Sequence, residues 1–108
     1  MNIRDREIYQ IHAEICQALT HATRLEIIDH LRAHEKTVGA LALEMAMPSS
    51  TISRHLRLMR EKGVVQARRD GPNVYYQLNN EKIVQAYDLI HQFVLEQYST
   101  QSNLFSTS

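Results

Sequence analysis

The sequence predicts a mainly α-helical chain that carries one small β-hairpin. Two observations support this fold class. Apolar residues recur at helical spacing through most of residues 4–63, with capping or turn residues between the helical stretches. From Val65 to Leu78 the period changes to an alternation of apolar and polar residues around a glycine-containing turn. At 108 residues the chain is long enough for one domain with a single core.

The most clearly marked helix lies between Pro48 and Gly63. The Ser49 hydroxyl is expected to cap its first turn, and Gly63 can adopt the left-handed conformation that ends a helix. One face is apolar and contains Ile52, Leu56 and Met59. The opposite face carries short polar and cationic side chains, namely Ser50, Ser53, Arg54 and Arg57. Such groups donate hydrogen bonds to phosphates and base edges, so the pattern indicates a DNA recognition helix.

The neighbouring segments predict a winged helix-turn-helix. Residues 38–45 form a shorter helix that Thr37 caps and the Met47–Pro48 pair ends, so two helices are joined by a tight turn. Residues 65–78 then form a two-stranded hairpin whose turn is residues 70–73. A hairpin directly after a recognition helix is a wing, and Arg68 and Arg69 give this one a cationic edge.

Two helices are expected before this unit and one after it. Residues 4–19 and 22–33 form the first two, and Thr20 is the expected cap of the second. Arg24 lies on the apolar side of that helix, where a guanidinium needs a carboxylate or carbonyl partner, so a structural role is favoured over a DNA contact.

The last helix is expected after Asn79 or Asn80 and ends near residue 98. The domain then covers residues 1–98, and residues 99–108 form a polar tail that is expected to be disordered. The first and last helices are both more apolar than a small core needs. This excess predicts that the chain dimerises through them.

The charge of the chain is unevenly distributed. The net charge is zero, yet residues 49–69 contain six basic residues and one acidic residue, a net charge of +5 that leaves −5 on the remainder. A positive field on one face attracts nucleic acid. An ordinary solvated helix face is the alternative, and the basic hairpin that follows makes it less favoured.

Composition excludes several other classes of protein. Cys16 is the only cysteine, which rules out an intramolecular disulfide or a multi-cysteine zinc site and fits a reducing cytoplasm. The N-terminus does not resemble a signal peptide, and no apolar run approaches the roughly 20 residues that span a bilayer. The sequence shows no paired nucleophile and base and no phosphate-binding glycine loop, so it does not indicate an enzyme.

Three stretches of the sequence resemble the ArsR/SmtB family of bacterial repressors. They are residues 18–28 (ALTHATRLEII), residues 50–65 (STISRHLRLMREKGVV), and Arg69-Asp70-Gly71 with the following Val74-Tyr75-Tyr76-Gln77-Leu78. The resemblance implies a winged-helix homodimer that pairs through its first and last helices. It also implies that the dimer represses transcription by binding an inverted repeat in its own promoter and that an inducer releases it.

By that resemblance the recognition helix enters the major groove, where Arg57 reads guanine or grips a phosphate, and the two hairpin arginines serve the wing. His55 lies at the margin of the buried face, and a structural role is an equal alternative for it. The candidate DNA-binding residues are Ser49, Ser50, Thr51, Ser53, Arg54, His55, Arg57, Arg68 and Arg69.

The sequence does not identify an inducer. The metal and redox sites familiar in the family cannot be carried over, because residues 38–45 contain no soft ligand and the last helix lacks the matching spacing. One set of residues, brought together across the dimer, could bind zinc or copper: His12, Cys16 and His91. Three alternatives stay open: Cys16 is a small buried apolar residue, Cys16 is a lone oxidisable thiol, or the protein has no inducer.

A second class of function is a winged-helix module that binds protein and not DNA. The serine-lined cationic face argues against it, because such a module does not need six clustered basic residues. The salt dependence of any DNA binding would separate the two classes.

Overall fold

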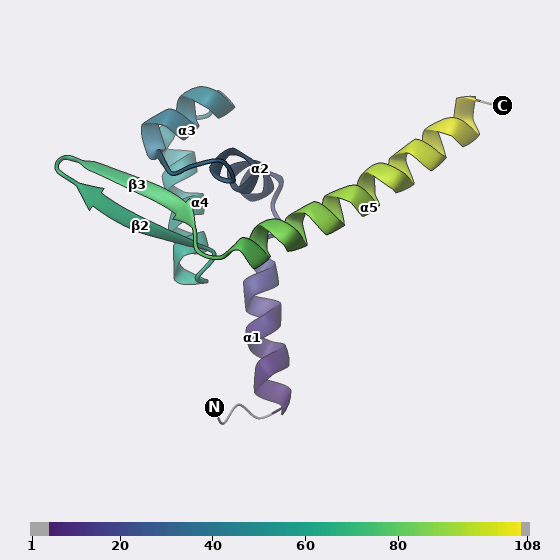
Figure 1. The fold of residues 1–108 in the computed structure, drawn as a ribbon, viewed down its shortest axis with the longest axis horizontal. Coiled ribbons are helices and arrows are strands. Elements are labelled where there is room, and N and C mark those ends of the chain that lie inside the picture. The colour runs from purple at the N-terminus through teal and green to yellow at the C-terminus, as the bar shows by residue number, and fades with distance from the viewer. Residues whose placement is uncertain (1–4, 107–108) are drawn as a thin grey trace.

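The computed structural model describes the backbone of residues 5–106 and the side chains of residues 5–99 (Figure 1). The fold is a mainly helical winged helix-turn-helix with a three-stranded antiparallel sheet, which confirms the predicted fold class. In chain order the elements are α1 (Asp5–Gln17), α2 (Ala22–Leu31), β1 (Lys36–Thr37), α3 (Val38–Met45), α4 (Ser49–Glu61), β2 (Val65–Asp70), β3 (Asn73–Leu78) and α5 (Glu81–Ser106).

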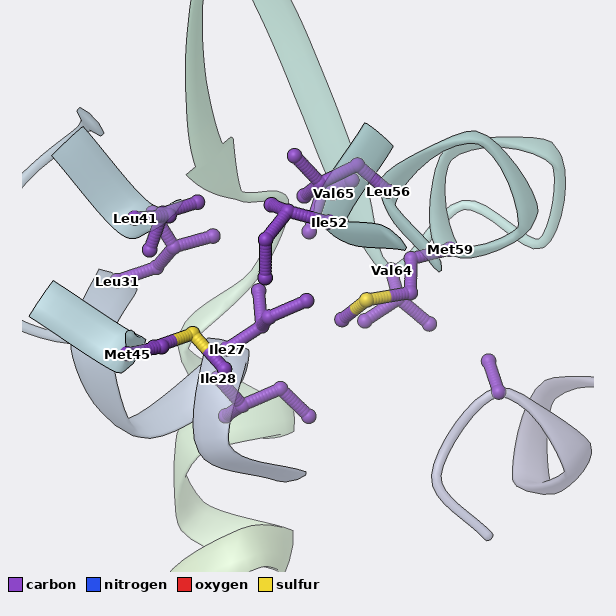
Figure 2. Close-up of a cluster of buried hydrophobic side chains, with 11 residues drawn as sticks. Ile27, Ile28, Leu31, Leu41, Met45, Ile52, Leu56, Met59, Val64 and Val65 are labelled. Atoms are coloured by element: carbon purple, nitrogen blue, oxygen red, sulfur yellow. The ribbon is translucent and has the colours of Figure 1, made fainter. Parts of the chain in front are cut away.

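The core lies where α2, α3 and α4 meet the base of the hairpin (Figure 2). Its members are the aliphatic and thioether side chains that these elements turn inward, joined by Ala18 from the end of α1: Ala18, Ile27, Ile28, Leu31, Leu41, Met45, Ile52, Leu56, Met59, Val64 and Val65. Burying each large side chain contributes about 1.5–3 kcal/mol. This cluster therefore fixes how the helix-turn-helix and the hairpin are held together.

The helix-turn-helix begins and turns through backbone capping. The Thr37 hydroxyl accepts a hydrogen bond from the Ala40 N–H at 3.1 Å, as predicted. Helix α3 ends at Ala46, which has φ 53° and ψ 47° and donates its N–H to the carbonyls of Ala42 and Leu43. This left-handed residue is an alanine, although the conformation favours glycine.

The predicted caps of α4 and α2 are wrong by one residue. Pro48 is the N-cap of α4, and its side chain has no polar atom that could make a capping bond. Ser49 is already the first residue of the helix, so it is not the cap. His21 caps α2, with its Nδ1 accepting from the Thr23 N–H at 3.2 Å. The Thr20 hydroxyl lies one residue earlier and donates to the Gln17 carbonyl at 2.8 Å, at the end of α1.

The sheet contains one strand that the sequence did not predict. Its order is β1-β3-β2, and Lys36 and Thr37 of β1 pair with Tyr76 and Tyr75. A two-residue strand is too short to show alternation, so these residues look like a polar connection. The hairpin itself closes as expected. Gly71, at φ +61°, is followed by Pro72, and this pair suits the two central positions of a type II′ turn.

Helices α1 and α5 project away from the body in different directions (Figure 1). The radius of gyration is 16.6 Å, whereas a compact chain of this length has about 13 Å. Asn80 caps α5 by accepting the Lys82 N–H at 2.8 Å, as predicted. The helix then continues to Ser106, beyond its expected end near residue 98, and no glycine or proline follows Pro72 to stop it.

None of the helices in the described range is long and apolar enough to cross a membrane.

We expect Ala46→Gly to raise the free energy of unfolding by about 1 kcal/mol, because glycine adopts the left-handed conformation without the steric cost of a Cβ. Chemical denaturation at neutral pH measures the change. Ala42→Gly, in the body of α3, is the matched control and should lower stability by roughly 0.5–1 kcal/mol. Equal destabilisation by both variants would contradict the assignment of a strained turn.

Candidate nucleic-acid interface

A basic groove runs between α4 and the hairpin. It has a volume of about 550 Å³ and is lined by Ser50, Ser53, Arg54, Arg57, Arg60 and Tyr76. The α4 residues of the lining are all exposed, because the opposite face of the helix is buried in the core. Four predicted DNA-binding residues therefore share one surface.

The register of the hairpin decides which of its arginines faces α4. The pairs Val65–Leu78, Ala67–Tyr76 and Arg69–Val74 lie on the same face of the two strands. A second hollow of about 290 Å³ continues the groove along this face, lined by Arg60, Ala67, Arg69, Val74 and Tyr76. The groove is thus extended by one hairpin arginine, Arg69.

Arg68 lies on the other face of the hairpin and is already paired. Its guanidinium donates two hydrogen bonds to the Glu35 carboxylate and lies 5.0 Å from the centre of the Tyr75 ring. This donation lowers the pKa of Glu35 below its ordinary value. The two hairpin arginines, which the sequence analysis assigned the same role, therefore have different surroundings. Arg69 borders the groove, and Arg68 attaches the hairpin to the segment before β1.

Two residues of the groove were not among the sequence-based candidates. Arg60 lies three residues after Arg57, so the helical spacing that selected Arg57 could have selected it too. Tyr76 packs against the buried cluster and also lines the groove. The alternation of the strand alone cannot show that one side chain does both.

The side of α4 away from the hairpin carries Thr51 and His55, which are both partly buried. The ring centroid of His55 lies 4.5 Å from that of His21, the cap of α2. Burial lowers the pKa of His55, and electrostatic interactions with His21, Arg24 and Arg54 lower it further. Ser49 is exposed at the start of the same helix.

Arg24 has the carbonyl partner that the sequence predicted. Its Nη2 donates to the Gln17 carbonyl at 3.2 Å, which ties α2 to the end of α1. The Nε atom is buried and has no hydrogen-bond partner among the described residues.

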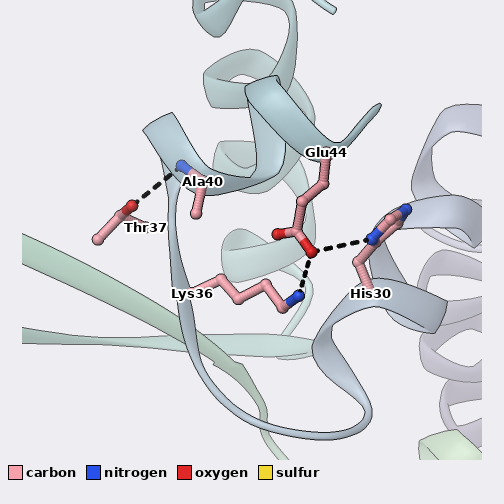
Figure 3. A network of polar contacts seen from close by, with 5 residues as sticks. All are labelled: His30, Lys36, Thr37, Ala40 and Glu44. Atoms are coloured by element: carbon pink, nitrogen blue, oxygen red, sulfur yellow. Dashed lines mark hydrogen bonds and ion pairs between the residues drawn. The ribbon is translucent and has the colours of Figure 1, made fainter. Parts of the chain in front are cut away.

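A polar network fixes α3, the first helix of the helix-turn-helix (Figure 3). Lys36 Nζ of β1 lies 2.5 Å from Glu44 Oε1 of α3, and His30 Nδ1 of α2 lies 3.8 Å from the same oxygen. The hydrogen bond from Lys36 is the main reason why the pKa of Glu44 is lowered. The Glu44 carboxylate thus connects α2, β1 and α3, and it helps to hold α3 in its position beside α4.

A second surface is apolar and lies on α1 and α5. No residue of α1 is buried, and its isoleucines Ile8, Ile11 and Ile15 are all exposed. On α5, Ile90 is 61% exposed and Phe93 59%. A hollow of about 200 Å³ between α2 and α5 has an almost wholly apolar lining of Leu19, Leu25, Ile28, Tyr87, Ile90, His91 and Val94. Exposed apolar area of this extent marks an interaction surface.

Helix α5 is attached to the body through Arg32, the C-cap residue of α2. Its guanidinium is paired with Asp29 and Asp88 and lies 5.3 Å from the centre of the Tyr87 ring. The pairing raises the pKa of Arg32, with the Asp88 hydrogen bond as the largest cause. The apolar surface of α5 is therefore held at a defined angle to the helix-turn-helix.

The candidate metal ligands do not meet within one chain. His12 and Cys16 are exposed on α1, while His91 stacks on Tyr87 with ring centroids 5.3 Å apart. Among the described residues, no three histidine, cysteine, aspartate or glutamate side chains are grouped closely enough to hold a metal. A site built from both chains of a dimer stays a prediction.

Comparison with known proteins identifies the family. The family model described as "Bacterial regulatory protein, arsR family" matches residues 21–67. The transcriptional repressor PagR of Bacillus anthracis is 36% identical over 72 residues, which cover 66% of this chain and 72% of PagR. The chain belongs to the ArsR family.

Other relatives agree with this assignment. The HTH-type transcriptional regulator KmtR of Mycobacterium tuberculosis is 35% identical over 72 residues, which cover 67% of this chain and 55% of KmtR, so the chain spans about half of that relative. A solved structure, the homodimeric winged helix-turn-helix DNA-binding domain of Mb0332 from Mycobacterium bovis, matches with a TM-score of 0.78 and 30% identity. The match covers 89% of this chain and 91% of that domain.

We expect the stability of the fold to fall as the pH drops from 7.5 to 5.5, in part because of His55. Its pKa in the folded chain is below the ordinary value of about 6.5, so the unfolded chain binds more protons in this range. The stabilisation is complete above the unfolded pKa and is lost as the pH falls through the folded one. Denaturation of His55→Gln should show a smaller decrease than the parent, and an equal decrease would contradict this assignment.

Proposed function

We propose that this chain is a sequence-specific, homodimeric transcriptional repressor that binds double-stranded DNA through the groove between α4 and the hairpin. One observation carries the proposal. Three exposed arginines lie on one face of α4, namely Arg54, Arg57 and Arg60, and none of them is paired with a carboxylate of the described residues. By contrast, Arg32 and Arg68 are each paired with carboxylates. An unneutralised row of this kind suits a polyanion.

The width of helix α4 fits the major groove of DNA. A helix with its side chains is about 10–12 Å wide and the major groove is about 12 Å wide. With its buried face fixed in the core, α4 presents Ser50, Ser53 and Arg57 to base edges. Arg60 and Arg69 then lie toward the phosphates on the hairpin side.

The apolar surface of α1 and α5 suits a second copy of the chain. A two-fold dimer would present two α4 helices, and such pairs bind half-sites about 34–36 Å apart, which implies an inverted repeat in the operator. Repression is favoured over activation because PagR, similar over most of its length, is named a repressor. We place the protein in the cytoplasm, where operator DNA is accessible.

A protein-binding module without DNA binding is the weaker alternative, because it leaves the basic groove unexplained. The proposal assigns binding and not catalysis to the chain. Release by an inducer, whether a metal at His12, Cys16 and His91 or an oxidant at Cys16, rests on the resemblance to the family and adds no requirement to the DNA-binding surface.

We expect Arg57→Ala to weaken binding to a duplex from the promoter of the chain's own gene by roughly five- to 150-fold, because an arginine that contacts DNA contributes about 1–3 kcal/mol. Fluorescence anisotropy at several salt concentrations measures this. Arg68→Ala removes the same charge outside the groove and is the matched control, with an expected change below threefold. If both variants bind like the parent, or the parent does not bind, the proposed interface is wrong.

We expect Ile90→Glu to shift the chain from dimer to monomer, because it places a carboxylate in the apolar surface between α2 and α5. Sedimentation velocity measures the state of association. Leu43→Glu is the control, since Leu43 is 85% exposed on α3, outside that surface. A dimer that survives Ile90→Glu would show that the chain pairs elsewhere.

A further inference from the structure

Basic side chains gather on the side of α4 that is opposite the hairpin. The rings of His21 and His55 lie 4.5 Å apart at 50°, and Arg24 and Arg54 are near enough for their charges to act on His55. We call these four residues the His21–His55 cluster. Two of them, His21 and Arg24, belong to α2 or its cap, so the cluster joins two elements that are separate in the sequence.

The cluster contains positive charges that no carboxylate balances and a hydrogen-bond donor that has no partner among the described residues. The charged groups that act on His55 are His21 and Arg24 from the α2 side and Arg54 from its own helix, and none of these is a carboxylate. The buried Arg24 Nε has no hydrogen-bond partner among the described residues, although its Nη2 donates to Gln17. The cluster therefore brings two guanidinium groups and an imidazole N–H donor together without a carboxylate from the described residues, which suits an anionic ligand.

The cluster lies where the second DNA strand would pass if α4 filled the major groove. A helix that fills the major groove has a DNA strand on each side, and Arg60 and Arg69 are placed for the strand on the hairpin side. In Figure 1 the hairpin extends to one side of α4, and α2 lies on the other. Arg54 lines the groove and also acts on His55, so the cluster continues the groove toward the opposite strand.

We propose that the His21–His55 cluster binds a backbone phosphate of the strand away from the hairpin, and that DNA binding is coupled there to the uptake of one proton by His55. This inference rests on the proposed function. His21 Nδ1 accepts the Thr23 N–H, so the neutral ring carries its proton on Nε2 and can donate it to a phosphate oxygen. Protonating His21 would break its capping bond, whereas the His55 ring accepts no hydrogen bond within the described structure.

The sign of the pH dependence follows from the charge of the phosphate. In the free protein, burial first, and then its interactions with His21 and with the cations Arg24 and Arg54, hold the pKa of His55 below its ordinary value. A phosphate beside the ring favours the imidazolium form, so the pKa rises in the complex and a proton is taken up from solvent. Affinity for DNA must then increase as the pH falls from 8.0 to 6.0.

The test compares affinity for the promoter duplex at pH 8.0 and pH 6.0 at constant ionic strength. We expect the parent to bind about three- to fivefold more tightly at pH 6.0 and His55→Gln to bind equally at both. His21→Asn keeps a good capping side chain, but the side chain is shorter and its donor no longer reaches the phosphate, so binding should weaken at both pH values. His34→Gln, remote from the cluster, should keep the full pH dependence of the parent.

Three results would overturn the proposal: equal affinity of the parent at both pH values, an undiminished pH dependence in His55→Gln, or parental affinity of His21→Asn at both pH values. Absence of DNA binding by the parent at either pH would instead contradict the proposed function. Should His55→Gln not fold, NMR titration of the parent decides: the pKa of His55 must rise when duplex is added. Millimolar inorganic phosphate must leave that pKa unchanged, since an equal rise would assign the cluster to free phosphate.

Discussion

The burial of Ile52, Leu56 and Met59 fixes the rotation of α4 about its own axis. All three side chains are fully buried, and they pack with Ile27 and Ile28 of α2 and with the two valines that lead into the hairpin. Because the helix cannot turn without exposing them, Ser50, Ser53 and Arg57 must face solvent on the opposite side. The same contacts seat the base of the hairpin, so the groove and its Arg69 border are consequences of one packing arrangement.

Two groups of arginines in the chain have different roles. Arg32 and Arg68 have carboxylate partners and aromatic neighbours, and they connect elements: α2 to α5, and the hairpin to the segment before β1. The arginines that line the groove have no carboxylate partner in the described structure. Exposed ion pairs add little stability, but here they determine which positive charges remain available to a ligand.

The sequence was a good guide wherever a helical or alternating pattern extended over several residues. It predicted the bounds of α3, the apolar face of α4, the hairpin and the Thr37 cap. It predicted Thr20 as the cap of α2, whereas the cap is His21, because α2 begins at Ala22 and Thr20 lies one residue too early, where its hydroxyl donates to a carbonyl of α1. The alternation of the strand places Arg68 and Arg69 on opposite faces, but it could not show that Arg68 is paired with Glu35, more than thirty residues away.

The central claim is that two copies of α4 read two half-sites on one duplex. Hydroxyl-radical footprinting on the promoter of the chain's own gene, with the number of chains per duplex measured on the same complex, tests it most directly. The account predicts two protected patches about 10–10.5 base pairs apart on one face of the DNA, with two chains bound. A single protected patch with one chain bound, or no protection at all, would contradict it.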